Sequence, residues 1–584
     1  MILVYFYRMS IVRLLDISDL TVDFINGNQN QRAVDHISFE LNESETLAVV
    51  GESGSGKTVT ALAILRLIPS PPGIVSSGSI IYYGLDRKEH NLGNLTEVGI
   101  QELRGKDISM IFQEPMTSLN PVFTCGDQVM ESLKIHLGYS RKQARNKTLD
   151  LFDEVMLPRP KDILSAFPHQ LSGGQKQRVM IAMAMACDPR ILIADEPTTA
   201  LDVSVQKTIL DLMKKLQATR KMSILFITHD LNLVSGFADR ALVMYKGKIV
   251  EQNTISSIFR SPQHLYTRGL IACRPPLHER LKRLPTIDSF MQGDSTFKPS
   301  VVSTNERIIN HQRLFAQDPL LIVEHLTKEF PGTESFFSRK KESIKAVDRT
   351  SFYVYPGETL GIVGESGSGK TTLARVLLEL IPASEGRILY KGQDITKLTS
   401  GILRKLRKEL QIIFQDPYSS LNPRHTIGFS IQEPMKVHHL HGNETRRKEK
   451  VMELLVKVGL KPEHYYRYPH EFSGGQRQRI CIARVLAVEP QLVICDESVS
   501  ALDVSIQAQI LNLLNDLKND YGLTYIFISH DLSVVKYMSD RLIVMKNGRI
   551  EEIGEADEVY ANPRSEYTRE LLKAIPIPIF EKIT

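Results

Sequence analysis

The chain has 584 residues, of which 42% are hydrophobic and 24% are charged, and it carries a formal net charge of +5. These values are ordinary for a globular protein and provide enough apolar material for two sizeable cores. The excess of 72 basic over 67 acidic residues is too small to predict nucleic-acid binding. Five scattered cysteines without a C-x-x-C pair favour reduced thiols over a disulfide framework.

The N-terminus begins with the apolar run MILVYFYRM, which is interrupted at Arg8. No basic residue precedes this run, no small-residue cleavage site follows it, and it is shorter than the ~20 apolar residues that span a bilayer. We interpret residues 1–12 as an N-terminal extension, with Met9 as an alternative start. No later stretch reaches the length of a span, so we expect that the chain itself does not cross a membrane.

The octapeptide GESGSGKT occurs twice, at residues 51–58 and 364–371. A short apolar run precedes each copy, and a helical pattern follows each and stops before Pro69 or Pro382. The pattern G-x-x-x-x-G-K-[ST] between a strand and a helix predicts a phosphate-binding loop, because backbone N–H groups can surround an anion there. We expect the lysine of each loop to reach the β- and γ-phosphates and the threonine to hold Mg²⁺.

The residues expected to bind the nucleotide through these loops are Gly51, Glu52, Ser53, Gly54, Ser55, Gly56, Lys57 and Thr58, and Gly364, Glu365, Ser366, Gly367, Ser368, Gly369, Lys370 and Thr371.

Two further segments, about 120–185 and 422–485, are rich in helical pattern and predict a separate helical subdomain in each half. Each contains a Ser-Gly-Gly-Gln sequence that would open a helix and form a second anion site. The residues are Ser172, Gly173, Gly174 and Gln175, and Ser473, Gly474, Gly475 and Gln476. An ordinary helix N-cap is the alternative interpretation. Two phosphate-binding surfaces per domain would be explained if each nucleotide is held between the loop of one domain and the Ser-Gly-Gly of the other.

Acidic residues end an apolar strand in both halves. We expect Asp195 and Asp496 to bind the Mg²⁺ shell, and the next residues, Glu196 and Glu497, to polarise the attacking water. A later strand of each half ends in a histidine, His229 or His530, which could contact the γ-phosphate and orient that water.

The two halves are copies of one domain of about 250 residues, because matching motifs lie 301 positions apart from the Ser-Gly-Gly segment onward. We place the domains at 13–270 and 319–584. The proline-containing stretch 271–318 between them is predicted to be a linker or small appendage. Alternating strands and helices indicate an α/β fold with a parallel sheet in each domain.

The complete set of motifs resembles the ATP-binding cassette (ABC) proteins over nearly the whole chain. The resemblance implies two tandem P-loop NTPase domains, each with a RecA-like parallel-sheet core and a helical subdomain, and ATP with Mg²⁺ as cofactors. It adds Gln113 and Gln415 to the metal-binding residues Thr58, Asp195, Thr371 and Asp496. Phe24 and Phe330 are candidates for stacking on adenine, with a core role as the alternative. Ser498 departs from the family pattern, where the first half has Pro197, and we expect a local backbone effect without loss of chemistry.

The finer resemblance is to ATPase subunits of oligopeptide/dipeptide importers, here two in one chain. It is carried by QEPMTSLNP and QDPYSSLNPR, and by matching tails at 261–272 and 562–575. It implies a monomer that works with two integral-membrane permease subunits and, indirectly, a solute-binding protein, on the cytoplasmic face of the inner membrane. Only Cys273 follows the first tail, where some relatives carry a cysteine cluster, so we predict no iron–sulfur site.

An alternative of another class is a soluble tandem ABC ATPase that acts on the ribosome. Such proteins join their cassettes by a long, strongly charged helical linker, which differs from the proline-broken 271–318. DNA-repair ABC ATPases carry zinc-type cysteine pairs that this chain lacks. Within the importers the cargo stays open among peptides, nickel, glutathione, opines and peptide-like toxins.

Overall fold

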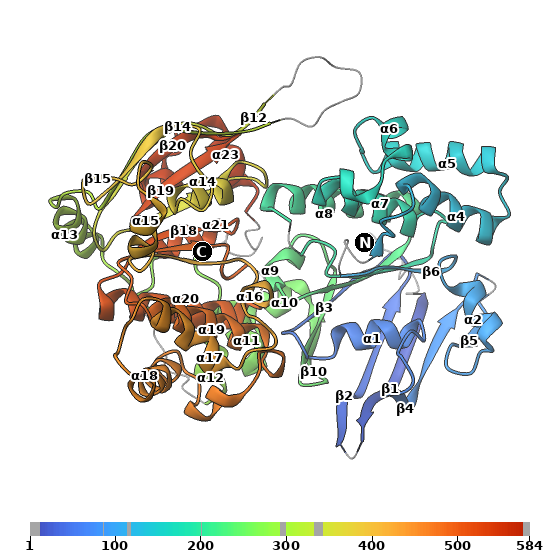
Figure 1. The fold of residues 1–584 in the computed structure, drawn as a ribbon. Coiled ribbons are helices and arrows are strands. Elements are labelled where there is room, and N and C mark those ends of the chain that lie inside the picture. Colours follow the sequence, from blue (N-terminus) through green and yellow to red (C-terminus); the bar gives the residue numbers. More distant parts are fainter. Residues whose placement is uncertain are drawn as a thin grey trace, which may run out of the picture. The chain divides into compact units, whose positions relative to one another are not determined.

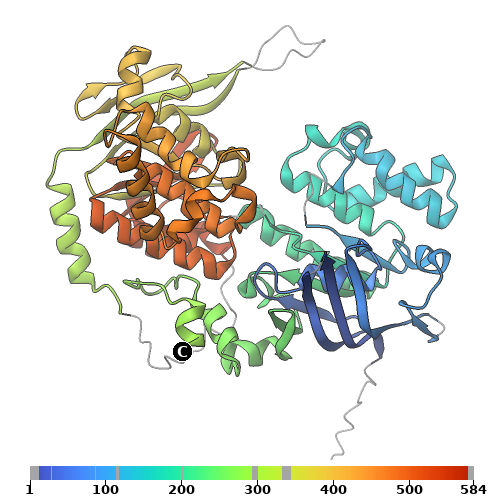
Figure 2. The ribbon, with the colours of Figure 1, turned by 60° about the horizontal axis from the view of Figure 1, so that its bottom comes forward.

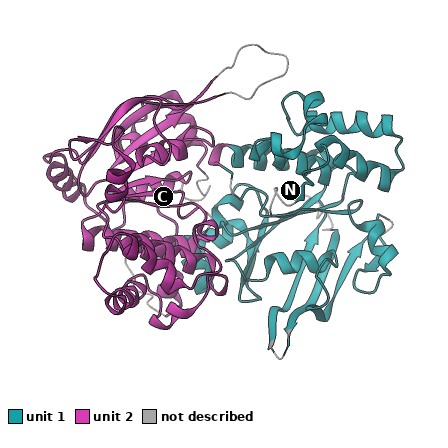
Figure 3. Cartoon of the chain, viewed as in Figure 1, with its two compact units in different colours: residues 1–201, 205–271, 576–584 teal, residues 202–204, 272–575 magenta. Residues whose placement is uncertain are grey.

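The computed structural model describes residues 12–27, 29–85, 87–113, 118–199, 201–292, 300–331, 343–500 and 502–575. Within these ranges the chain divides into two compact units, which Figure 3 shows in different colours. Residues 12–201 and 205–271 form the first unit, and residues 202–204 and 272–575 form the second.

The first unit contains a six-stranded sheet, a four-stranded sheet and a group of helices (Figure 1). Its elements are β1 (Arg13–Asn26), β2 (Gln29–Asn42), β3 (Thr46–Val50), α1 (Lys57–Ile64), β4 (Gly73–Tyr83), β5 (Glu89–Asn91), α2 (Glu97–Leu103), β6 (Ile108–Ile111), α4 (Cys125–Leu137), α5 (Arg141–Glu154), α6 (Pro160–Ser165), α7 (Gly173–Ala184), β7 (Ile191–Asp195), α8 (Val203–Arg220), β8 (Ser223–Thr228), α9 (Leu231–Val234), β9 (Arg240–Tyr245), β10 (Lys248–Thr254), α10 (Ile255–Arg260) and α11 (Leu265–Ala272).

The six-stranded sheet has the order β10-β9-β3-β8-β7-β6, and all neighbours pair in parallel except β9 and β10. Strand β3 reads TLAVV and every residue in it is buried, as expected for a central parallel strand covered on both faces. The antiparallel sheet has the order β2-β1-β4-β5. Residues of β1, β2 and β4 share one apolar core with Ala61 and Ile64 of α1 and with β3, β7 and β8, so α1 packs between the two sheets.

The second unit repeats this arrangement with sheet orders β16-β17-β18-β13-β19-β20 and β12-β11-β14-β15. Its elements are α12 (Ile287–Met291), α13 (Thr304–Phe315), β11 (Leu321–Phe330), β12 (Ile344–Val354), β13 (Thr359–Val363), α14 (Lys370–Leu377), β14 (Glu385–Tyr390), β15 (Gln393–Asp394), α15 (Ser400–Leu406), β16 (Leu410–Ile413), α16 (Pro417–Ser420), α17 (Ile427–Val437), α18 (Glu444–Lys457), α19 (Gly474–Leu486), β17 (Leu492–Asp496), α20 (Val504–Tyr521), β18 (Thr524–Ile528), α21 (Leu532–Met538), β19 (Arg541–Lys546), β20 (Arg549–Glu555), α22 (Ala556–Ala561) and α23 (Glu566–Lys573).

The α/β class, the parallel cores and the helical segments expected near 120–185 and 422–485 are confirmed. Helices α4 to α7 occupy the first of these segments, and α17 to α19 occupy the second. The helices after the phosphate loops are shorter than predicted. They end at Ile64 and Leu377 rather than before the prolines, because Arg66 and Glu379 adopt the left-handed backbone conformation with φ 51 and φ 49.

The segment between the two cassettes is structured in its described part. Helix α13 starts at a capping box, in which the Ser303 hydroxyl accepts from the Glu306 N–H and the Glu306 carboxylate accepts from the Ser303 N–H. In Figure 2 the yellow-green helix α13 runs along the second unit, to which it belongs. The guanidinium of Arg307 in α13 donates to Glu555, near the end of the chain. None of the helices in the described ranges combines the length and the apolar character that a bilayer crossing demands.

Candidate functional site

Each phosphate loop leaves the carboxyl end of the central parallel strand, β3 or β13, and enters the helix that follows. The turn into each helix is made by a glycine with positive φ, Gly56 at 100° and Gly369 at 102°. A Cβ on Gly56 would lie 2.6 Å from the carbonyl oxygen of Ala33, so the backbone leaves no space for a side chain there. Glycine is therefore required at this position by conformation and by packing.

We expect Gly56→Ala to lower the thermal unfolding midpoint and to weaken ATP binding. A left-handed alanine costs about 1–2 kcal/mol, and the contact with Ala33 adds a further cost because backbone atoms cannot yield easily. Gly54→Ala is the matched control, since Gly54 also has positive φ (78°) but has no heavy atom within 4 Å of its added Cβ. Calorimetry should show the larger loss for Gly56→Ala, and equal losses would contradict the packing argument.

The loop lysine is buried inside the turn that it serves. Lys57 Nζ donates to the carbonyl oxygens of Gly51 (2.7 Å) and Glu52 (2.9 Å), and its side chain is 5% exposed. Lys370 Nζ makes the same bonds to Gly364 (2.8 Å) and Glu365 (2.9 Å). These bonds fix the ammonium group at the centre of the loop, where the motif requires a cation for the phosphates.

The predicted metal ligands of each half are brought together. Thr58 Oγ1 donates to Asp195 Oδ1 at 3.2 Å, and Thr371 Oγ1 donates to Asp496 Oδ1 at 3.1 Å. Burial raises the pKa of Asp195 to about 6, against the opposing hydrogen bond from Thr58, and burial likewise raises the pKa of Asp496. A nearby cation would therefore favour the ionised form of either carboxylate.

This donor set fits Mg²⁺, which prefers oxygen ligands and is commonly bound by one or two carboxylates together with substrate phosphates. The described residues contain no group of three or more His, Cys, Asp or Glu side chains that could hold a metal.

In the first half, the glutamate after the strand-end aspartate is held by three side chains. Glu196 Oε2 accepts from Gln113 Nε2 (3.1 Å) and Thr199 Oγ1 (2.9 Å), and it lies 3.2 Å from His229 Nδ1. Burial alone would raise the pKa of Glu196, but the hydrogen bond and charge of His229 lower it to about 2. The carboxylate is therefore ionised at neutral pH, as a group that polarises water must be.

The second half keeps two of these three contacts, because Ser500 donates to the backbone carbonyl of Glu497 rather than to its carboxylate. Gln415 Nε2 donates to Glu497 Oε2 at 2.7 Å, and His530 Nδ1 lies 3.6 Å from that oxygen. The pKa of Glu497 is lowered despite its burial because His530 faces it. Glu196 and Glu497 have nearly the same positive φ, 46° and 48°, so the local backbone effect predicted for Ser498, which stands where the first half has Pro197, is not seen in the φ of the preceding residue. Each glutamine contacts the glutamate through its amide nitrogen, which leaves the amide oxygen as the atom able to bind a cation.

The Ser-Gly-Gly-Gln sequences form helix N-caps. Ser172 Oγ accepts from the Gln175 N–H at 3.3 Å and caps α7, and Ser473 Oγ accepts from the Gln476 N–H at 3.4 Å and caps α19. Both serines are exposed. A serine hydroxyl that accepts a capping bond still has its own O–H to donate, so the cap and a phosphate contact are compatible.

The two aromatic candidates for adenine stacking have different surroundings in the structure. Phe24 is half-buried and packs against the apolar core of the first unit, which favours the core role. Phe330 is 37% exposed, and Lys328 Nζ lies 5.3 Å from its ring centre. The five cysteines all lie within the described residues, are buried and form no disulfide with one another.

Sequence reasoning missed one contact that occurs in both halves. Tyr266 in α11 accepts a hydrogen bond from the backbone N–H of Glu52 at 3.0 Å, and Tyr567 in α23 accepts one from Glu365 at 3.2 Å. Each buried tyrosine thus connects a tail segment to the phosphate loop. The signal available in the sequence was the Tyr-Thr-Arg shared by the two tails, at 266–268 and 567–569.

We expect Tyr266→Phe/Tyr567→Phe to raise the KM for ATP with a smaller effect on kcat. Removing each hydroxyl leaves a loop N–H without its partner, at a cost of about 1 kcal/mol, which corresponds to roughly a fivefold weaker interaction. Steady-state kinetics measure both constants. Tyr353→Phe, at a tyrosine that is 50% exposed, serves as control. An unchanged KM in the double variant would show that the tails do not support the loops.

Two stretches, residues 34–199 and 347–500, match the family model described as "ABC transporter". Together they cover more than half of the 584 residues. The chain belongs to the ABC transporter family. The tails, residues 250–296 and 552–583, match "Oligopeptide/dipeptide transporter, C-terminal region", which confirms the resemblance seen in both tails.

The alignments with similar full-length proteins extend over nearly the whole chain. The "Glutathione import ATP-binding protein GsiA" of Salmonella paratyphi A is 47% identical over 568 residues, which are 96% of this chain and 89% of that protein. The protein of the same name from Escherichia coli K12 is 48% identical over the same shares. A solved dimeric bacterial ABC transporter cassette is 27% identical, covers 40% of this chain and 98% of its own, and superposes with a TM-score of 0.36.

As a member of this family, the chain is an ATP-binding protein and an ATPase. It is a peripheral, membrane-associated subunit of a transporter and works with membrane permease partners and a binding protein.

Proposed function

We propose that this chain is the ATP-hydrolysing subunit of an importer for short peptides and peptide-like solutes, glutathione among them. The observation that carries the proposal is the match of both tails to the oligopeptide/dipeptide transporter region, in a chain that resembles glutathione import proteins over 96% of its length. Glutathione is itself a tripeptide, so the two comparisons indicate one chemical class of cargo.

The proposed assembly has one copy of this chain and two permease subunits at the cytoplasmic face of the inner membrane, with a solute-binding protein that delivers cargo. Domains at 13–270 and 319–584, joined by 271–318, supply the two cassettes. One intramolecular pair is sufficient because each half carries every motif needed for a nucleotide site.

Each ATP would be held by the phosphate loop of one cassette and the Ser-Gly-Gly of the other. Lys57 and Ser473 would then serve one nucleotide, and Lys370 and Ser172 the other. When bound, Mg²⁺ would neutralise phosphate charge beside Thr58, Asp195 and Gln113, or their counterparts Thr371, Asp496 and Gln415.

Within this chain, Glu196 and Glu497 would polarise the water that attacks the γ-phosphate. His229 and His530 would hold these carboxylates ionised and in position, as their distances from the glutamates support. Ser172 and Ser473 would contact the nucleotides only in the closed pair of cassettes, so bound ATP would favour closure. Loss of the γ-phosphate would remove that preference.

The test is uptake by cells that depend on this chain and its permeases. Labelled glutathione and a labelled dipeptide should both accumulate with the parental chain, and neither should accumulate with Lys57→Ala/Lys370→Ala. Accumulation of nickel alone would contradict the cargo. The same cells distinguish the alternative function, because a ribosome factor would sediment with ribosomes rather than with membranes that contain the permeases.

A further inference from the structure

A cavity of about 790 Å³ lies in the second unit, beside helix α13 of the connecting segment. Its other walls come from the ends of α20 and α21 and from Pro356 and Gly357, which directly precede β13. The phosphate loop leaves the opposite end of β13, and no residue of the candidate nucleotide site lines the cavity. Helix α13 also lies outside the stretches matched by the family models.

The lining of this cavity carries more cations than anions. Five basic residues face it, namely Arg280, Lys282, Arg307, Arg313 and Lys518, against the two carboxylates of Glu306 and Asp540. The four amide side chains Asn310, Gln317, Asn515 and Asn519 complete a wall rich in hydrogen-bond donors. Such a wall is suited to a ligand with several negatively charged acceptor groups.

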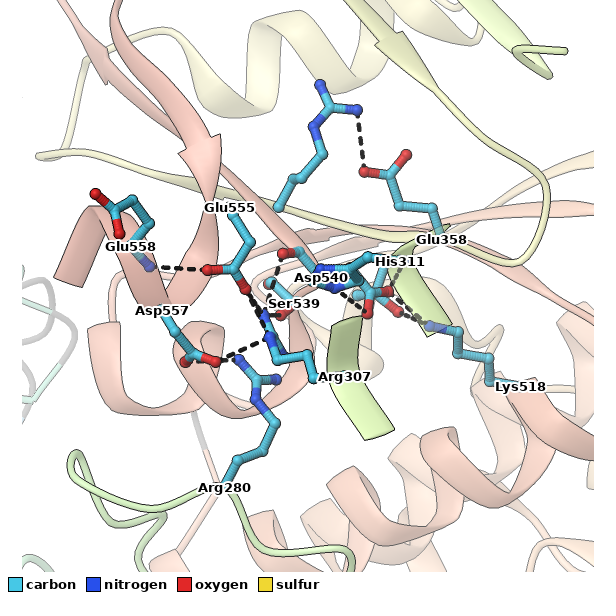
Figure 4. Close-up of polar contacts among 12 residues, drawn as sticks. Arg280, Arg307, His311, Glu358, Lys518, Ser539, Asp540, Glu555, Asp557 and Glu558 are labelled. Atoms are coloured by element: carbon cyan, nitrogen blue, oxygen red, sulfur yellow. Dashed lines mark hydrogen bonds and ion pairs between the residues drawn. The ribbon is translucent and has the colours of Figure 1, made fainter. Parts of the chain in front are cut away.

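One buried cation of the lining, Arg280, lacks a complete set of partners. Its Nη1 donates to the Tyr537 carbonyl at 2.9 Å and its Nη2 to Asp557 at 3.1 Å, as Figure 4 shows for Asp557. Its Nε is buried and has no hydrogen-bond partner among the described residues. Burial and the neighbouring Arg307 lower the pKa of Arg280. Because this Nε has almost no accessible surface, an anion in the cavity would be attracted by the charge of the Arg280 guanidinium rather than by a bond to that atom.

Other charged groups of this region already have partners. Arg307 pairs with Glu555 and Asp557, and Asp540 lies between Lys518 and His311 (Figure 4). These pairs hold α13 and α20 in place and fix the lining groups. Arg313 and Lys282 lie at the rim, where Arg313 is exposed and the Lys282 side chain, which pairs with Glu306 at 2.6 Å, is 47% exposed. Both are accessible to a ligand that enters from solvent.

The first unit repeats these features only in part in its sequence. Positions 301 residues before Lys518 and Asp557 hold Gln217 and Ser256, whereas the position that corresponds to Asp540 also holds an aspartate, Asp239. The complete cluster is thus specific to the second cassette, whereas the nucleotide motifs are present in both. A requirement of the ATPase fold alone would be expected to appear twice.

We propose that this cavity binds a small organic anion with two or more carboxylate or phosphate groups. Its volume falls within the range of clefts that bind small organic ligands, about 300–1,000 Å³, and it is open to solvent. Arginine side chains recognise carboxylates and phosphates through paired hydrogen bonds, so the lining fits both chemistries. The proposal does not depend on the cargo of the transporter.

Isothermal titration calorimetry on the full chain, without nucleotide and at about 0.15 M salt to screen non-specific attraction, tests this site. The probes are an N-acetylated triglutamate peptide for carboxylates and fructose 1,6-bisphosphate for phosphates. Their uncharged counterparts are an end-blocked triglutamine peptide and fructose. At least one charged probe should bind with a dissociation constant below 1 mM, and the one that binds identifies the acidic group preferred.

The rim variant Lys282→Gln/Arg313→Gln should weaken that binding at least tenfold. Lys397→Gln/Arg446→Gln removes the same charge from exposed positions outside the cavity and should leave the affinity unchanged. The proposal is overturned if neither charged probe binds, if the uncharged counterparts bind equally well, or if the two double variants have equal effects. Circular dichroism confirms folding of both variants, whose side chains lie at the surface.

Discussion

Combining Lys57→Ala with Ser473→Asp should leave one intact nucleotide site, whereas combining Lys57→Ala with Ser172→Asp should leave none. In the proposed assembly, Lys57 and Ser473 contact the same triphosphate, so two lesions there damage one site. Lys57 and Ser172 contact different triphosphates. Aspartate caps a helix about as well as serine, so α7 and α19 keep their N-caps, but its charge repels the phosphates. Removing such phosphate-stabilising contacts typically lowers turnover about 100-fold or more.

The readouts are ATP hydrolysis and the number of nucleotides bound per chain. The same-site pair should bind one ATP and hydrolyse it at the rate of Lys57→Ala alone. The other pair should bind ATP weakly at both sites and show no turnover above background. Lys370→Ala/Ser172→Asp and Lys370→Ala/Ser473→Asp are the mirror-image controls. If the effects of the two pairings were reversed, each nucleotide would be held within a single cassette, and the shared-site mechanism would be wrong.

The site could be predicted from sequence because its parts lie at chain positions marked by local signals. A buried strand followed by glycines and a helix specifies the phosphate loop without distant information. Glu196 and His229 then meet, since the parallel strands β7 and β8 end on the same edge of the sheet. The predictions of reduced cysteines, of importer-type tails and of an α/β fold likewise came from composition and local motifs.

Other features were not predictable because they depend on distant partners. The strand pairing of the first four-stranded sheet is one of them, since the register between β1 and β2 shifts several times and each shift depends on the partner strand. The connecting segment reads as a proline-broken linker, yet Arg280 pairs with Asp557, 277 positions away. Similarly, no local pattern indicates that the Tyr266 hydroxyl reaches the backbone of Glu52, 214 positions earlier.

Replacing both water-polarising glutamates, as Glu196→Gln/Glu497→Gln, should give a chain that binds ATP but hydrolyses it at least about 100-fold more slowly. Glutamine has nearly the shape of glutamate but cannot act as a base, and general-base catalysis contributes about 10²–10⁴-fold to a rate. The amide can still lie beside Gln113 and His229, or beside Gln415 and His530, so the loops and metal ligands are undisturbed. ATP should therefore remain trapped with its γ-phosphate intact, and filter binding with γ-labelled ATP measures this directly.

The single variants Glu196→Gln and Glu497→Gln show whether the two halves contribute equally to ATP hydrolysis. We expect equal contributions, because a glutamine contacts the glutamate in both halves. Glu102→Gln/Glu433→Gln, at two exposed glutamates, controls for the loss of two charges. Turnover by Glu196→Gln/Glu497→Gln within twofold of the parental rate would contradict the role assigned to these carboxylates. Loss of ATP binding in that variant would mean instead that the glutamates maintain the structure of the site. His229 and His530 face the ionised Glu196 and Glu497, and they would lose these charged partners in the variant.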